Sequence, residues 1–193
     1  MKQPALILAS KSPRRRDILS LMQIPFETLS VDTEELFEPD CSIEENLTRI
    51  ALEKARAAEK QLAEPGGRTI FLGADTVVAK GTRVLGKPSG FDEAFSMLKS
   101  LQNRSHQVYT GFVLLSADAT HTECVSTSVE FEPMSDKEIT RYLLAVKPYD
   151  KAGSYGIQDP LMACHVRRIE GCYYNVVGLP LSRVCLAMKQ FIR

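Results

Sequence analysis

The sequence lacks a net charge, a long apolar run and a regular set of cysteines. Its 24 basic and 24 acidic residues cancel, which gives no support for nucleic acid or an anionic membrane surface as a partner. No apolar stretch approaches the roughly 20 residues that a membrane-spanning helix needs, and the apolar run near the start is too short for a signal peptide. We therefore expect a cytoplasmic protein whose local charge clusters bind a small ligand rather than a polymer.

The number and spacing of the cysteines and histidines argue against a disulfide framework, a zinc site and a nucleophilic triad. The five cysteines are odd in number and irregularly spaced, which favours reduced thiols over a disulfide framework. Cys164 and His165 lie near Cys172, but this spacing fits no zinc pattern. The three histidines have no serine or cysteine placed as in a nucleophilic triad.

The length of 193 residues allows one domain with an ordinary core, or two lobes that share one sheet. Helical and strand patterns are interspersed and several hairpins are predicted, which indicates an α/β protein with one mixed sheet. The predicted strands are 5–9, 26–31, 69–79, 84–85, 105–116 and 122–131, followed by a hairpin that turns at Glu170-Gly171. The predicted helices are 13–22 (with Ile18, Leu19, Leu21 and Met22 inward), 43–63, 91–101, 136–147 and one from about Leu181. Capping boxes, Ser42 with Glu45 and Ser135 with Glu138, are predicted to begin the helices 43–63 and 136–147.

A run of arginines stands at a predicted helix start, where its charge is unfavourable. Ser12 suits the N-cap, Pro13 suits the first helical position, and residues 14–16 are all arginine. A helix N-terminus already carries about half a positive charge, so three cations there favour the arrival of an anion. Free backbone N–H groups and guanidinium groups together bind phosphate. The alternative is a solvated basic turn.

Asp75 is an acidic residue inside a strongly apolar strand. Ile-Phe-Leu-Gly-Ala precedes it and Thr-Val-Val-Ala follows it, a pattern typical of a central strand. An ionised carboxylate there is costly unless it is paired or holds a metal, and Gly73 leaves room for a ligand. The alternative is an aspartate that caps a turn at a strand end, which the apolar residues beyond Thr76 disfavour.

Two lysines also stand at unusual places. Lys54 lies seven positions after Leu47, on the apolar stripe of the predicted helix 43–63. Its side chain either reaches out to solvent or delivers an ammonium group to a cleft. Lys87 lies between a glycine and a proline at the end of a hairpin, where an ordinary surface turn is the alternative.

Glu34 and Glu35 directly follow a predicted strand, so a loop would project them over the sheet edge. With Asp75 they would supply hard oxygen ligands for a magnesium-type ion; alone they are an acidic loop. Residues 150–158 include two glycines suited to close backbone approach but match no Walker A or dinucleotide fingerprint. Taken together, these features favour polyphosphate chemistry, in which cations neutralise charge and a carboxylate positions water.

Six short motifs stand in order along the chain. They are Leu-Ala-Ser-Lys-Ser-Pro-Arg-Arg at 8–15, Glu-Lys-Ala at 53–55, Gly-Ala-Asp-Thr at 73–76, Gly-Lys-Pro at 86–88, Asp-Lys-Ala-Gly-Ser-Tyr-Gly-Ile-Gln at 150–158 and Val-Gly-Leu-Pro-Leu at 177–181. In order and spacing they resemble the Maf family of septum-formation-inhibitor-like nucleotide pyrophosphatases. The likeness covers essentially all of residues 1–193 and implies a single domain. It further implies an elongated, partly antiparallel mixed sheet with helices on both sides, two lobes flanking a central cleft, and often a homodimer.

The resemblance also implies a reaction and a role for individual residues. A nucleoside triphosphate would be hydrolysed to the monophosphate and pyrophosphate with a divalent metal, Mg²⁺ or Mn²⁺. Asp75 would accept the proton of the attacking water and, with Glu35, form the metal region. Lys54 and Lys87 complete the expected catalytic set and, with Ser10 and Arg15, would hold the phosphates. The expected substrate-binding residues are Ser10, Arg14, Arg15, Thr76, Lys151 and Gln158.

Substrate preference is implied by Arg14, Thr76 and Gln158, which resemble the dTTP/UTP branch of the family. The 7-methylguanosine triphosphate branch commonly has tryptophan in place of the first arginine. One departure is Asp159-Pro160, where the family usually continues with glycines; Pro160 restricts the loop at the base-reading end of the site. We predict hydrolysis of dTTP, UTP and modified pyrimidine nucleotides in house-cleaning of nucleotide pools. The alternatives are a preference for purine or 7-methylguanosine triphosphates, and a non-hydrolysing nucleotide-binding regulator of cell division.

Overall fold

Seven strands form one mixed sheet in the computed structural model, which describes residues 5–62 and 68–192. The strands are β1 Ala5–Ala9, β2 Glu27–Leu29, β3 Thr69–Lys80, β4 Arg83–Leu85, β5 Ser105–Leu115, β6 Thr120–Phe131 and β7 Val166–Glu170. Their order in the sheet is β2-β1-β3-β5-β6-β7, and β4 pairs with β3. Strand β1 is parallel to β2 and β3, whereas β4 is antiparallel to β3 and β7 is antiparallel to β6. The predicted α/β fold with a mixed sheet is therefore confirmed.

Two compact units divide the chain. Unit 1 comprises Met1–Asp75, Thr110–Val125 and Gly178–Arg193, and unit 2 comprises Thr76–Tyr109 and Ser126–Val177. Three of the four boundaries fall within β3, β5 and β6, and the fourth, between Val177 and Gly178, directly follows α6. In the described part of the chain, no helix is both long and apolar enough to span a membrane. The five cysteines are free thiols.

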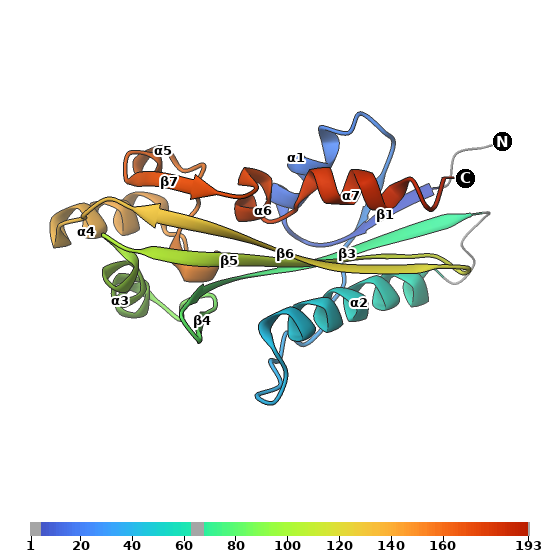
Figure 1. The fold of residues 1–193 in the computed structure, drawn as a ribbon, viewed down its shortest axis with the longest axis horizontal. Coiled ribbons are helices and arrows are strands. Elements are labelled where there is room, and N and C mark those ends of the chain that lie inside the picture. The colour runs from blue at the N-terminus through green and yellow to red at the C-terminus, as the bar shows by residue number, and fades with distance from the viewer. Residues whose placement is uncertain (1–4, 63–67, 193) are drawn as a thin grey trace. The chain divides into compact units, whose positions relative to one another are not determined.

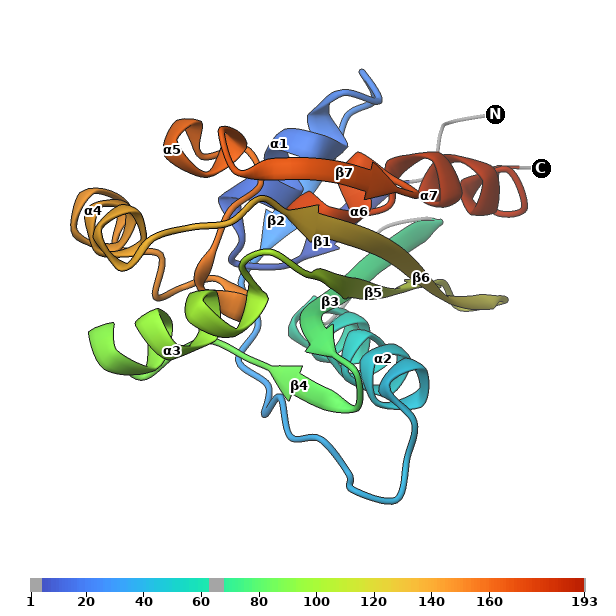
Figure 2. The same cartoon turned by 60° about the vertical axis from the view of Figure 1, so that its left-hand side comes forward.

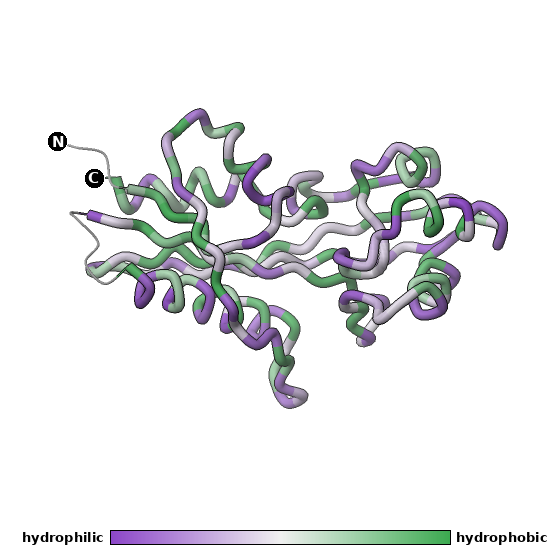
Figure 3. The backbone as a smooth tube through the Cα atoms, turned by 180° about the vertical axis from the view of Figure 1, so that it is seen from behind, coloured by the Kyte–Doolittle hydropathy of each residue, from purple (hydrophilic) through white to green (hydrophobic). Residues whose placement is uncertain are grey.

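Unit 1 contains helices α1 (Pro13–Ser20), α2 (Ile43–Gln61) and α7 (Leu181–Met188). Helices α1 and α7 lie on one side of β1, and α2 lies on the other (Figure 1). The start of α2 is fixed by the predicted capping box, in which Ser42 and Glu45 bond to each other's backbone N–H groups. Hydrophobic and hydrophilic residues alternate along α2 (Figure 3), so one face packs on the sheet.

Two glycines allow α2 to lie unusually close to the sheet. A Cβ atom at Gly73 in β3 would lie 2.0 Å from the carbonyl oxygen of Ala51 in α2. A Cβ atom at Gly111 in β5 would lie 2.7 Å from the backbone of Leu47. Any larger residue at either position would push the helix away from the strands. The close contact fixes the height of α2 above β3.

Unit 2 contains α3 (Phe91–Leu101), α4 (Asp136–Val146), the short helices α5 (Pro160–Ala163) and α6 (Tyr173–Val177), and a 3₁₀ turn at Ala152–Ser154. Helices α3 and α4 lie side by side (Figure 2) and are in contact. Their inner faces bury Leu98 and Tyr142, which join Phe131 of β6 in one core. The second predicted capping box, Ser135 with Glu138, begins α4.

Several sequence-based expectations need correction. Leu21 is 54% exposed because α1 ends at Ser20, and β2 is only three residues long. The predicted hairpin at Gly171 is wrong: after β7 the chain enters α6. The buried Asn175 explains this, because its amide donates to the Val108 carbonyl and the Thr127 hydroxyl, both at 3.0 Å. The predicted end of the helix 43–63 lies outside the described residues.

Candidate active site

Glu35, Lys54 and Asp75 form an ion-pair cluster in unit 1. Lys54 Nζ lies 2.6 Å from Asp75 Oδ1 and 2.7 Å from Glu35 Oε1. Lys54 and Asp75 expose only 6% and 7% of their surface, whereas the Glu35 side chain is 40% exposed. The predicted carboxylate in apolar surroundings is confirmed. Lys54 does not reach out to solvent, because its ammonium group joins the two carboxylates.

The backbone geometry explains why Lys54 and Asp75 meet. Successive residues of a strand alternate between faces, so Asp75 points to the same side of β3 as Gly73. Gly73 admits the backbone of α2 at Ala51, and Lys54 lies one helical turn further along α2. The ammonium group therefore reaches the carboxylate directly. Removing these charges from water is costly, and mutual attraction at hydrogen-bond distance offsets that cost.

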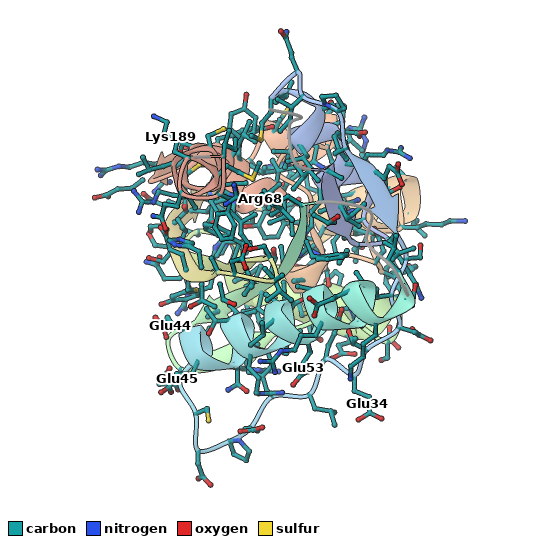
Figure 4. The ribbon with its side chains drawn as sticks, turned by 90° about the vertical axis from the view of Figure 1, so that its right-hand side faces the viewer. Glu34, Glu44, Glu45, Glu53, Arg68 and Lys189 are labelled. Atoms are coloured by element: carbon teal, nitrogen blue, oxygen red, sulfur yellow. The ribbon has the colours of Figure 1, made fainter. Side chains whose placement is uncertain are left out.

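The acid loop, residues 32–41, supplies the second carboxylate. Both Glu34 and Glu35 were candidates, and the structure separates them. Glu34 is exposed and points away from α2 (Figure 4), while the Glu35 carboxylate reaches Lys54. Nothing in the loop sequence favours one of the two neighbouring glutamates, whereas the family resemblance implied Glu35.

Arg15 links the start of α1 to this cluster. Its Nε donates to the Gly178 carbonyl at 2.9 Å, and a terminal nitrogen lies 3.5 Å from Ser10 Oγ, which also accepts from the Ser12 N–H at 3.1 Å. Burial lowers the pKa of Arg15, and the negative charges of Asp75 and Glu35 oppose that shift. The arginine therefore lies within electrostatic reach of both carboxylates. Arg14 is half-buried, and its positive charge lowers the pKa of Arg15 further.

The other predicted site residues belong to unit 2. Thr76 directly follows Asp75 in β3 and is half-buried, whereas Lys87 and Gln158 are exposed. Lys151 is held within the unit: its Nζ lies 3.2 Å from Asp159 Oδ2, and the two side chains are only 12% and 15% exposed. The roles of these four predicted residues toward a substrate stay predictions.

The sequence alone did not identify two sets of side chains that hold the loops of predicted site residues in place. In unit 2, the Tyr142 hydroxyl donates to Asp159 Oδ2 at 2.7 Å and accepts from the Gly156 N–H at 3.1 Å. In unit 1, Asn46 and Arg49 of α2 bind the backbone of the acid loop. Asn46 had a signal like that of Lys54, since it is a polar residue four positions before Ile50 on the apolar stripe.

Three kinds of chemistry are available to these groups. A buried carboxylate beside an ammonium can accept a proton from water. The Arg15 guanidinium group and the Ser10 hydroxyl, both near the start of α1, can bind phosphate oxygens. Within residues 5–62 and 68–192, no three His, Cys, Asp or Glu side chains are grouped to hold a metal. The carboxylate pair would therefore need phosphate or water oxygens to complete a metal's coordination.

Comparison with known proteins places the chain in a family. A model described as Maf-like protein matches residues 5–191. The dTTP/UTP pyrophosphatase of Pelodictyon phaeoclathratiforme is 72% identical over 192 residues, which cover 100% of each chain. The dTTP/UTP pyrophosphatase of Chlorobium chlorochromatii is 58% identical, over 97% of this chain and 95% of that one. Among solved structures, the Staphylococcus aureus Ham1 protein aligns at 17% identity with a TM-score of 0.46, over 66% of this chain and 71% of that one. From its family match and its two bacterial relatives, the chain belongs to the Maf family.

Proposed function

We propose that this protein is a metal-dependent nucleoside triphosphate pyrophosphatase that hydrolyses dTTP and UTP to the monophosphate and pyrophosphate. The observation that carries the proposal is Asp75, which is nearly buried and bonded to Lys54 Nζ at 2.6 Å. The relatives from Pelodictyon and Chlorobium, both named dTTP/UTP pyrophosphatases, support dTTP and UTP as the substrates of this chain. A role in clearing nucleotide pools, a cytoplasmic location and a homodimer stay predictions.

In this reaction Asp75 acts as the proton acceptor for water. The water oxygen bonds to the α-phosphorus as the bond from that phosphorus to the bridging oxygen breaks, and pyrophosphate leaves with the bond electrons. Lys54 orients the Asp75 carboxylate through its hydrogen bond. Arg15, held by the Gly178 carbonyl, and the Ser10 hydroxyl are the proposed phosphate ligands.

Glu35 and Asp75 fit a divalent cation such as Mg²⁺ or Mn²⁺. Both carboxylates already approach one positive group, Lys54 Nζ, within 2.7 Å. Mg²⁺ is commonly held by one or two carboxylates together with substrate phosphates. When bound there, the cation would neutralise negative charge on the triphosphate.

The test is pyrophosphate release by the purified chain from dTTP, UTP, GTP and 7-methylguanosine triphosphate, with magnesium varied. We expect fastest turnover on dTTP and UTP, and loss of turnover when magnesium is chelated. Faster turnover on either guanine nucleotide would reject the preference that Arg14, Thr76 and Gln158 imply. Binding of nucleotide without any release of pyrophosphate would instead identify a non-hydrolysing regulator.

A further inference from the structure

We infer that Arg49 is a positioning residue for the reaction proposed above, on which this inference rests. Together with Asn46, Arg49 holds the acid loop against α2, so that Glu35 stays within reach of Lys54. In the described part of the chain, the hydrogen bonds and ion pairs of Arg49 join it to the acid loop and to its neighbours on α2. Its effect on the ion-pair cluster would therefore pass through the loop.

Arg49 binds the acid loop directly next to Glu35. One terminal nitrogen donates to the Leu36 carbonyl at 2.6 Å, and Nε lies 3.3 Å from Glu38 Oε1. The other terminal nitrogen donates to Glu53 Oε1 at 2.9 Å, on the same helix. The planar guanidinium group can make these contacts at once, which a lysine ammonium on a flexible stem cannot reproduce.

Asn46 fixes the following part of the loop. Its Oδ1 accepts from the Glu38 N–H at 2.7 Å and from Arg49 at 3.1 Å. Its amide nitrogen lies within 3.2 Å of the carbonyl oxygens of Glu38, Cys41 and Ser42. Asn46 is 1% exposed. A buried amide with this many backbone partners imposes one path on the loop.

The acid loop needs this support because it buries little of its own surface. Glu34, Glu35 and Glu38 are exposed, and Leu36 is 66% exposed. Apolar burial therefore contributes little to its ordering, while backbone ordering costs free energy at every residue. The bonds from α2 restrict the loop, and α2 also carries Lys54. One helix thus positions both the ammonium group and the carboxylate that binds it.

The kinetic test combines Arg49→Met with Glu35→Gln. Arg49→Met keeps an unbranched side chain but removes every donor. We expect kcat/KM for dTTP to fall about 10-fold to 100-fold, the range seen when groups supporting a metal ligand are removed. If Arg49 acts through Glu35, the double variant will lose no more than about threefold beyond Glu35→Gln alone. Losses that multiply would overturn the inference.

A second readout does not depend on activity. The probes are two backbone amides of the acid loop: the Glu38 N–H donates to Asn46 Oδ1, and the Cys41 N–H donates to the Glu38 carbonyl. In Arg49→Met the hydrogen exchange of both amides should accelerate at least about tenfold, because the loop opens more often once it has lost the bonds from Arg49. A tenfold acceleration corresponds to a loss of about 1.4 kcal/mol of local stability. Unchanged exchange there would refute the inference, whether or not the wild type hydrolyses nucleotides. Absence of pyrophosphate release from the wild type would refute the proposed function alone.

Two further variants control for folding. Arg56→Met removes an exposed arginine from the same helix and should leave activity and loop exchange unchanged. Arg49→Lys keeps the positive charge and serves if Arg49→Met does not fold. We expect its loop exchange to be intermediate. Exchange equal to that of the wild type in Arg49→Lys would show that charge alone suffices and would reject the forked hydrogen bonds as the cause.

Discussion

Unit 1 and unit 2 each hold a lysine that the family resemblance assigns to the site, but by different means. In unit 1, Lys54 projects from the long helix α2 and its ammonium group lies between two carboxylates at 2.6 and 2.7 Å. In unit 2, Lys151 lies in a loop and pairs with Asp159 at 3.2 Å. The unit 1 group is positioned by regular elements, which hold a side chain more accurately than a loop does.

The loop in unit 2 that carries Lys151 is held by contacts to neighbouring side chains. Tyr142 of α4 donates to Asp159, and a Cβ atom at Gly156 would lie 2.7 Å from Asp159 Oδ2. Tyr155 bonds to the buried His106 at 2.7 Å. The loop is therefore fixed by contacts to its surroundings. In unit 1 the ammonium group is therefore held by charge pairing between regular elements, while in unit 2 close packing and the tyrosine hydrogen bonds hold the loop in addition to its one ion pair.

The largest expected effect tests the charge pairing in unit 1. Lys54→Met should lower the free energy of unfolding by about 4 kcal/mol, because two carboxylates lose a shared partner and Asp75 is left buried. Urea denaturation measures this. The double variant with Asp75→Asn should recover part of the loss, and Lys60→Met on the exposed face of α2 should change stability by less than about 0.5 kcal/mol. Equal effects of Lys54→Met and Lys60→Met would contradict the comparison.

The next effect concerns catalysis at the same cluster. Asp75→Asn keeps the shape of the side chain but removes its capacity to accept a proton. We expect kcat/KM for dTTP to fall at least about a hundredfold, the scale for loss of a positioned proton acceptor. Steady-state pyrophosphate release measures it, with circular dichroism to verify the fold. Undiminished activity would show that Asp75 is not the base.

A smaller expected effect is a pH dependence of the unfolding free energy that comes from His106, a buried residue of unit 2. Burial lowers the pKa of His106 from 6.5 to about 4. Between these values the unfolded chain binds more protons than the folded one, so stability falls as pH drops from 6.5 toward 4. The change should be about 2 kcal/mol between roughly pH 7 and pH 4.5. Denaturation at both pH values measures it, and His106→Gln should remove this part of the dependence. An unchanged slope in that variant would assign the dependence to other groups.

The smallest effect tests the ion pair in the loop of unit 2. Asp159→Asn keeps an acceptor for the Tyr142 hydroxyl but loses the charge that faces Lys151. We expect a loss of about 1.5 kcal/mol in unfolding free energy, since hydrogen bonds to charged groups contribute on this scale. Thermal denaturation measures it. Lys151→Met, measured alone and together with Asp159→Asn, gives the coupling energy between the two side chains. Losses of stability that simply add would show that the two residues act independently.

Much of the fold was predictable because its signals are local. The capping boxes at Ser42 and Ser135 fixed two helix starts, and apolar runs fixed β1 and β3. Helix α6, which stands where a hairpin was predicted at Gly171, was not predictable in the same way. This helix depends on the hydrogen bonds that the Asn175 amide donates to β5 and β6. The residues next to Asn175 in the sequence do not predict those bonds.

The local sequence predicted which charged side chains would lie in apolar surroundings. Asp75 in an apolar strand and Lys54 on an apolar stripe carry a desolvation cost that their immediate neighbours impose, so each had to find a charged partner. Their local sequence does not show that they pair with each other; the fold brings the two side chains together and places beside Lys54 the Glu35 carboxylate that the family resemblance implies. Those partners lie 21 and 19 residues from Lys54, and they meet because Gly73 lets α2 approach β3 and because α2 holds the acid loop.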